Sequence, residues 1–116
     1  MAEKIKIMQG DAYSIPFGMS DQNGETIRGE HVAEIEVTIG AGSDQPLVRK
    51  TMTDGGVTYD PSAEMFLVRL EQKDTFALAF REGKMKVRVH FAGTDDVCGE
   101  DVAEIEVRNS FSKEVL

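Results

Sequence analysis

The sequence contains little that covalent chemistry could use. Among its 116 residues there is one cysteine, no tryptophan and only two histidines. Because Cys98 has no second cysteine to pair with, no disulfide can form within the chain, and packing alone must hold the fold. No plausible base neighbours Cys98 in the sequence, so we interpret it as a bystander rather than a nucleophile.

Catalytic constellations are also missing. Nucleophilic catalysis needs a serine or cysteine beside an oriented base, and the sequence has no Gly-X-Ser-X-Gly nucleophile elbow. His90 belongs to the polar face of an expected strand and His31 to a strand entry, where solvated roles are the ordinary ones. The sequence therefore predicts a protein that is not an enzyme, with no catalytic residues and no cofactor.

Positive charge and long apolar runs are scarce as well. The chain has 13 lysines and arginines against 21 aspartates and glutamates, a net charge of −8. Because cationic side chains supply most of the affinity for phosphates, we do not expect nucleic acid as a partner. No apolar run approaches the ~18 residues that span a bilayer, and Met1–Gly10 carries charges where a signal peptide is apolar. We expect no membrane partner, and synthesis in the cytoplasm.

What the sequence does have is strand alternation. In Lys84–Phe91 every second residue is apolar and the others are basic, which is typical of a strand buried on one face. A nine-residue pattern, Gly-Glu-X-Val-Ala-Glu-Ile-Glu-Val, occurs twice, at Gly29–Val37 and Gly99–Val107. We expect the two copies to flank the basic strand with opposite charges facing each other. The residues expected to meet in this way are Glu34, Glu36, Glu104, Glu106, Lys86 and Arg88.

Further short alternating segments are separated by turn residues. The expected strands are Glu3–Gly10, Tyr13–Met19, Val32–Ile39, Leu47–Met52, Val57–Tyr59 and Met65–Leu70. Pro16 lacks an N–H and must lie at a sheet edge or a bulge.

The turn residues predict how some of these strands are connected. Asp54–Gly56 predicts a hairpin between its two neighbouring strands. Within Glu71–Phe80, the residues Phe76, Ala79 and Phe80 stand at helical spacing, which predicts one helical turn bridging two sheets.

Seven or eight short strands with one helical turn predict an all-β fold. We expect a two-layer antiparallel immunoglobulin-like β-sandwich, formed as a single domain by residues 1–116. A small barrel is the alternative. Residues 109–116 read as a tail that can be flexible.

One group of residues could bind a metal ion. Four carboxylates lie close together after the basic strand, at Asp95, Asp96, Glu100 and Asp101. Their oxygens could bind Ca²⁺, but they lack the alternating spacing and glycine hinge of an EF-hand loop. A solvated acidic loop is the preferred interpretation, and no metal is expected.

Five segments carry a resemblance to a known family. They are Ile5–Asp11, Ile15–Phe17, the turn Asp21–Gly24, Leu70–Phe76 and the ending Ser110–Leu116. Together they resemble small prophage-encoded proteins of Gram-positive bacteria, which are similar to the N-terminal immunoglobulin-like domain of phage baseplate upper proteins. The shared features are strand and turn signatures rather than a site.

The resemblance implies a structural or assembly protein associated with a phage tail or baseplate. Its partners would be other phage proteins or further copies of the chain, and it would be found in the host cytoplasm at synthesis and later in the virion. The apolar tail residues Phe111, Val115 and Leu116 are the candidates for docking on a neighbour, and an exposed sheet edge is a second candidate surface. A stand-alone binding domain for a carbohydrate or cell-surface ligand is the alternative.

Overall fold

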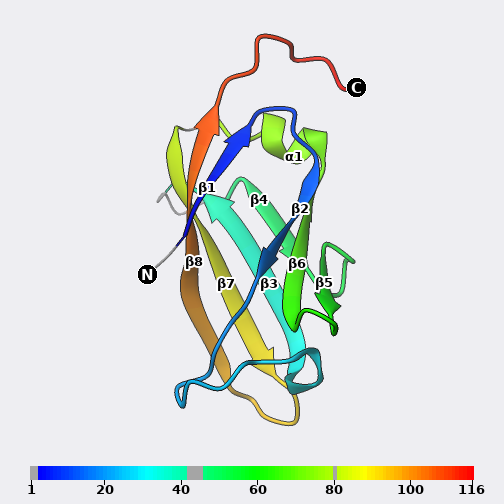
Figure 1. The fold of residues 1–116 in the computed structure, drawn as a ribbon, viewed down its shortest axis with the longest axis vertical. Coiled ribbons are helices and arrows are strands. Elements are labelled where there is room, and N and C mark those ends of the chain that lie inside the picture. Colours follow the sequence, from blue (N-terminus) through cyan, green and yellow to red (C-terminus); the bar gives the residue numbers. More distant parts are fainter. Residues whose placement is uncertain (1–2, 42–45, 80) are drawn as a thin grey trace.

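Two β-sheets packed face to face make up the computed structural model, which describes residues 3–41, 46–79 and 81–116 (Figure 1). The five-stranded sheet has the spatial order β1 (Glu3–Met8), β8 (Val97–Arg108), β7 (Glu82–Phe91), β3 (Val32–Gly40) and β4 (Val48–Thr51). The three-stranded sheet has the order β2 (Tyr13–Phe17), β6 (Met65–Leu70) and β5 (Val57–Asp60). A 3₁₀ turn, η1 (Gly29–His31), precedes β3, and one short helix, α1 (Gln72–Phe76), follows β6.

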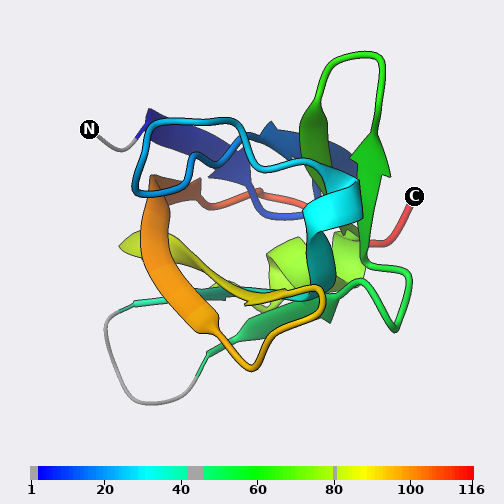
Figure 2. The same cartoon turned by 90° about the horizontal axis from the view of Figure 1, so that it is seen from below.

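The expected β-sandwich is confirmed, while its immunoglobulin-like character stays a prediction. Figure 2, seen from below, shows the strands arranged around a common interior. Buried apolar side chains from both sheets fill this interior as one cluster. Phe66 of β6 lies fully buried against the rings of Phe17 and Tyr59, with centroids 5.8 and 4.8 Å away. No helix in the described part of the chain is long and apolar enough to cross a membrane.

The basic strand β7 lies between the two copies of the repeated pattern, as expected. β3 and β8 pair with it on either side, both antiparallel. Val87 pairs with Val37 on one side, and Met85 pairs with Ala103 on the other, and all four side chains are buried. The alternation of each strand therefore places its apolar face on the same side of the sheet.

The expected charge pairs form only in part. Arg88 faces Glu36, with Nη1 3.7 Å from Oε1. Lys86 meets Asp101 instead of a glutamate, at 3.7 Å, and Glu104 lies opposite Lys84. The expectation was wrong here because the β7–β8 turn closes sooner than assumed.

That turn sets the register of the hairpin. Phe91 N–H donates to Asp96 O at 3.1 Å, within the usual range of a backbone hydrogen bond. β8 therefore starts at Val97 inside the segment expected to be a loop, and a register shift beside Lys86 follows. Glu106 ends up next to the edge strand, where its carboxylate is 3.4 Å from Lys4 Nζ.

Two edge strands differ from each other in how they pair. β1 pairs with β8 in parallel, so the fully antiparallel arrangement expected from the sequence is wrong at this edge. Pro16 lies in β2, which pairs only with β6 and is an edge strand, as expected. At such an edge the missing N–H removes no ladder hydrogen bond.

The expected hairpin at Asp54–Gly56 is wrong, because β4 and β5 belong to different sheets. Asp54 Oδ1 accepts the N–H groups of Thr51 and Gly56, at 3.1 and 2.7 Å. The bond from Gly56 is the main cause that holds the pKa of Asp54 below its ordinary value. These bonds stabilise a tight turn, but the turn leads the chain out of one sheet into the other.

Glu34 fixes the start of this crossover. Its carboxylate accepts hydrogen bonds from the Met52 N–H, at 2.9 Å, and from the N–H and hydroxyl groups of Thr53. It therefore binds the backbone that leaves β4 instead of a cation of β7. These hydrogen bonds, chiefly the one from the Thr53 hydroxyl, lower the pKa of Glu34.

The helical turn between the sheets is confirmed, over Gln72–Phe76. Its anchor is Thr75, which is fully buried. Thr75 Oγ1 donates to Asp11 O at 2.8 Å and accepts the Gly10 N–H at 2.9 Å. Phe80, one of the residues expected to stand at helical spacing, lies outside the described residues.

We expect Thr75→Val to destabilise the fold by about 1–3 kcal/mol, because it keeps the shape but leaves two partly buried backbone groups, Gly10 N–H and Asp11 O, without this partner. Urea unfolding followed by circular dichroism measures the change. Thr58→Val, at an exposed position of β5, is the matched control. Equal midpoints for the two variants would show that the Thr75 hydroxyl does not hold the helical turn.

A second prediction concerns pH. Because the pKa of Glu34 is lowered in the folded state, its contribution to stability is present above the ordinary value of 4.5 and is lost as the pH falls through the lowered value. Glu34→Gln should therefore reduce the loss of unfolding free energy between neutral and acidic pH. The control is Glu104→Gln, at the equivalent position of the second copy, and unfolding midpoints measured across that range compare the two. The interpretation fails if both variants keep the full pH dependence.

Candidate functional site

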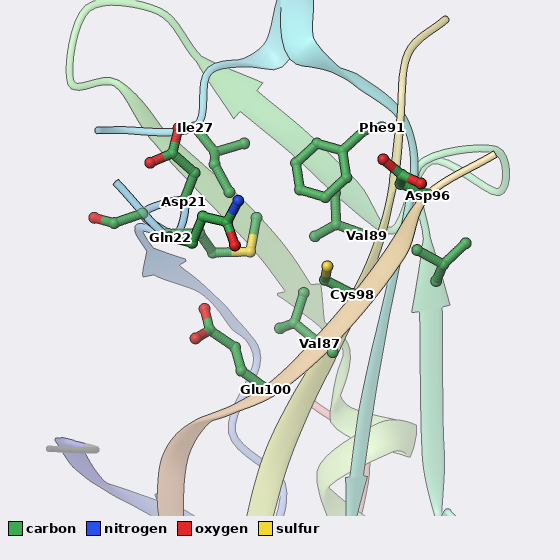
Figure 3. Close-up of a pocket in the computed structure, with 13 residues that line it drawn as sticks. Asp21, Gln22, Ile27, Val87, Val89, Phe91, Asp96, Cys98 and Glu100 are labelled. Atoms are coloured by element: carbon green, nitrogen blue, oxygen red, sulfur yellow. The ribbon is translucent and has the colours of Figure 1, made fainter. Parts of the chain in front are cut away.

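A groove of about 420 Å³ lies at the end of the molecule that holds the β2–β3 connection and the β7–β8 turn (Figure 1, Figure 3). One wall is the inner face of β7 and β8, with Val87, Val89 and Cys98. The opposite wall is the β2–β3 connection, with Met19 and Ile27. The walls are therefore apolar, apart from one thiol.

The groove exists because the two sheets differ in length. β7 and β8 have 10 and 12 residues, whereas β2, β6 and β5 have 5, 6 and 4. At about 3.3 Å per residue, β8 is roughly 40 Å long and the longest strand of the smaller sheet about 20 Å. The inner face of β8 near Val97 therefore extends past the smaller sheet, and the β2–β3 connection only partly covers it.

Carboxylates surround the groove. Figure 3 shows Glu100 and Cys98 pointing from β8 into the space, with Asp21 and Gln22 across from Glu100. Asp96 lies at the other end, beside Phe91. The rim is thus acidic and the interior apolar.

The charge balance differs between the groove and the outer sheet face. On the outer face, Glu36 pairs with Arg49 at 2.6 Å, and Asp101 pairs with Lys84 at 3.3 Å. Among the described residues, the rim carboxylates Asp21, Asp96 and Glu100 take part in no ion pair. No cation of the described residues forms an ion pair with them.

The strand at the groove also has an open edge. β1 pairs with β8 only from Ala103 to Arg108, and within residues 3–41, 46–79 and 81–116 no strand pairs with that edge over Val97–Glu100. The Phe91–Asp96 bond fixes the alternation of the antiparallel ladder, so Cys98 and Glu100 bond to β7. Val97, Gly99 and Asp101 therefore direct their N–H and C=O groups away from β7, toward the open edge.

The structure does not bring the four candidate calcium ligands together. Glu100 and Asp101 are consecutive in β8 and point to opposite faces, Glu100 into the groove and Asp101 toward Lys84 on the outer face. Asp95 and Asp96 belong to the turn. In the described part of the chain no three histidine, cysteine or acidic side chains could hold a metal ion together.

The tail residues predicted to dock are exposed. Phe111 and Leu116 are fully accessible and Val115 is two-thirds accessible. Residues 109–116 form neither helix nor strand, and Lys113 Nζ donates to Gln9 Oε1 at 2.6 Å. The tail lies at the end of the molecule opposite to the groove (Figure 1). Docking by the tail stays a prediction.

Both histidines are bound to local backbone. His31 Nδ1 accepts the Arg28 N–H at 3.1 Å, and His90 Nε2 lies 2.8 Å from Thr94 O. Each ring thus helps to close a turn.

Sequence reasoning missed the groove, because the pattern within one strand does not show where the facing sheet ends. No sequence signal marked it, because β8 begins six residues before the part that pairs with β1, and Val97–Val102 show no apolar alternation.

Comparison of the sequence with protein-family models and with curated proteins gave no significant match.

The acidic rim leads to a prediction about Cys98, which is exposed in the groove. A dianionic disulfide reagent should be repelled, whereas neutral iodoacetamide should not. Glu100→Gln should raise the ratio of the anionic to the neutral rate about twofold at low salt, by the energy of one charge at this range in water. Because both reagents react with the same thiol, any change in the reactivity of Cys98 itself cancels in the ratio of the two rates.

Glu104→Gln, on the outer face of the same strand, is the control and should leave the ratio unchanged. Salt at about 0.5 M should remove the difference. An unchanged ratio in Glu100→Gln at low salt would show that the rim does not set the field in the groove.

Proposed function

We propose that this chain is a non-enzymatic interaction module of a phage particle, associated with the tail or baseplate or with their assembly. The observation that carries the proposal is the open edge of β8 above an apolar groove with an acidic rim. A strand edge beside a groove is the arrangement by which many domains bind an extended segment of a partner, with backbone hydrogen bonds for affinity and side-chain pockets for specificity. The resemblance in the strand and turn segments supplies the phage setting.

The position of the two candidate surfaces supports an assembly role. The groove lies at one end of the long axis and the apolar tail at the other. A subunit that offers different surfaces at its two ends can contact a different neighbour with each, as ring components do. Repetition then adds weak contacts into a stable whole. Its partners would be other phage proteins or copies of itself, first in the host cytoplasm and then in the virion.

Quantitative mass spectrometry of particles purified from a culture that produces the phage tests this function. We expect the chain in particles or their precursors, and deletion of 109–116 should lower its amount at least about tenfold, since burial of one Phe side chain is worth about 1.5–3 kcal/mol. Ser112→Ala is the matched control within the tail. Absence of the intact chain from both particles and precursors would overturn the function. Full incorporation of the deleted form would overturn only the part played by the tail.

A further inference from the structure

The open edge of β8 limits what can occupy it. From Val97 to Asp101 the edge is five residues long, about 17 Å at 3.3 Å per residue. β1 begins beside Ala103, and the turn at Asp96 closes the other end. A segment of about five residues therefore fits as an added strand. Its side chains would alternate between the groove and the outer face, in step with those of β8.

Each position on this edge favours a particular kind of side chain in the added strand. Beside Cys98 the added side chain enters the apolar groove, and beside Glu100 it meets an unpaired carboxylate. On the outer face, Val97 is half exposed and apolar. Gly99 is flanked by Arg88, since a Cβ placed on Gly99 would lie 3.3 Å from Arg88 Cγ. The edge thus favours apolar side chains beside residues 97 and 98 and a basic side chain beside residue 100.

The chain's own tail has this pattern when read antiparallel to β8. Leu116 falls beside Val97, and Val115 falls beside Cys98. Glu114 falls next to Gly99, on the face where Arg88 already pairs with Glu36, and Lys113 falls beside Glu100. Two of the three exposed apolar residues of the tail, Val115 and Leu116, and its lysine are therefore matched with the open edge of β8.

We propose that Ser112–Leu116 of one copy adds as an antiparallel strand to the Val97–Asp101 edge of a second copy, with Lys113 on the partner's Glu100. This inference rests on the proposed function and names the partner at its site. Tail and groove lie at opposite ends of the molecule, so the contact is head-to-tail and makes chains or closed rings. The tail must give up the bond from Lys113 Nζ to Gln9 and two bonds with the Gln72 side chain, one donated by the Leu116 N–H and one accepted by Leu116 O.

Symmetric pairing of two β8 edges is a poorer use of the same surface. It would bring the Glu100 carboxylates of two copies close together without a cation, and like charges on neighbouring strands are destabilising. The other described edges are also less suitable. β2 contains Pro16, β4 and β5 have four residues each, and β1 presents Lys4 and Lys6.

Sedimentation equilibrium of the intact protein over a wide concentration range tests the contact. The mass of the wild type should rise above 12.8 kDa with concentration. Lys113→Glu should weaken association at least about tenfold, the effect of losing one charged hydrogen-bonded pair. Because Lys113 lies outside both sheets, this variant leaves the fold intact. Lys113→Arg is the control and should associate as the wild type does.

Two further variants test the geometry. Gly99→Pro removes an N–H at the open edge without breaking a bond to β7, and should abolish association, whereas Gly99→Ala should retain it after a small shift of Arg88. Glu100→Lys alone should be monomeric. A mixture of Glu100→Lys with Lys113→Glu should associate again, because each tail then finds a groove of opposite charge. Failure of this mixture to associate would overturn the proposed register.

A synthetic peptide of residues 109–116, with a scrambled peptide as control, identifies the occupant directly. It should slow the alkylation of Cys98 by iodoacetamide in the wild type and not in Gly99→Pro. A wild type that stays monomeric, together with an unprotected Cys98, overturns this inference and leaves the phage role to the particle experiment. Association that persists in both Lys113→Glu and Gly99→Pro also overturns it, because another surface would then be responsible.

Discussion

The burial of β7 between two strands of nearly the same sequence is the constraint on which the rest of the structure depends. β7 carries its apolar residues at every second position, as does β3 from Ile35 to Ile39 and β8 from Ala103 to Val107, so the observed pairing buries all three rows together. A slip by one residue would turn each row toward solvent. This central packing fixes the larger sheet, and the smaller sheet covers only the part of it where Phe66, Val68 and Leu70 can reach. What remains uncovered at the end of β7 and β8 is the groove.

Local alternation was enough to predict most strands and the place of β7. It marked Met65–Leu70 with the bounds that the structure has, and it put the basic strand between the two copies. Alternation is a property of a single strand. The face of the strand that carries the apolar residues is the face that is buried. Such features can be read from the residues themselves.

Features that depend on two distant segments could not be predicted in this way. A tight turn at Asp54 is equally compatible with a hairpin and with a crossover, and the hydrogen bonds from the backbone at Met52 and Thr53 to Glu34 accompany the crossover. The sequence pattern of β1 does not say that it runs parallel to β8, nor that its described residues pair only with Ala103–Arg108. The groove and its open edge arise because β8 is longer than β1 and longer than the strands of the smaller sheet. Composition and motifs gave no sign of them. The tail was different, because the apolar character of Phe111, Val115 and Leu116 is visible in the sequence.

The distribution of charge connects the fold with its proposed use. On the outer face the glutamates and the cations of β7 neutralise one another, and such exposed pairs contribute little to stability. At the groove the carboxylates have no cation among the described residues, so the chain keeps an uncompensated negative end. Unpaired carboxylates of this kind disfavour pairing between the β8 edges of two copies and favour a partner segment that contains a lysine. A five-residue strand gives weak affinity by itself, because ordering it costs conformational entropy. The contact would therefore be sparse between free subunits and would become stable where a symmetric scaffold holds many copies side by side.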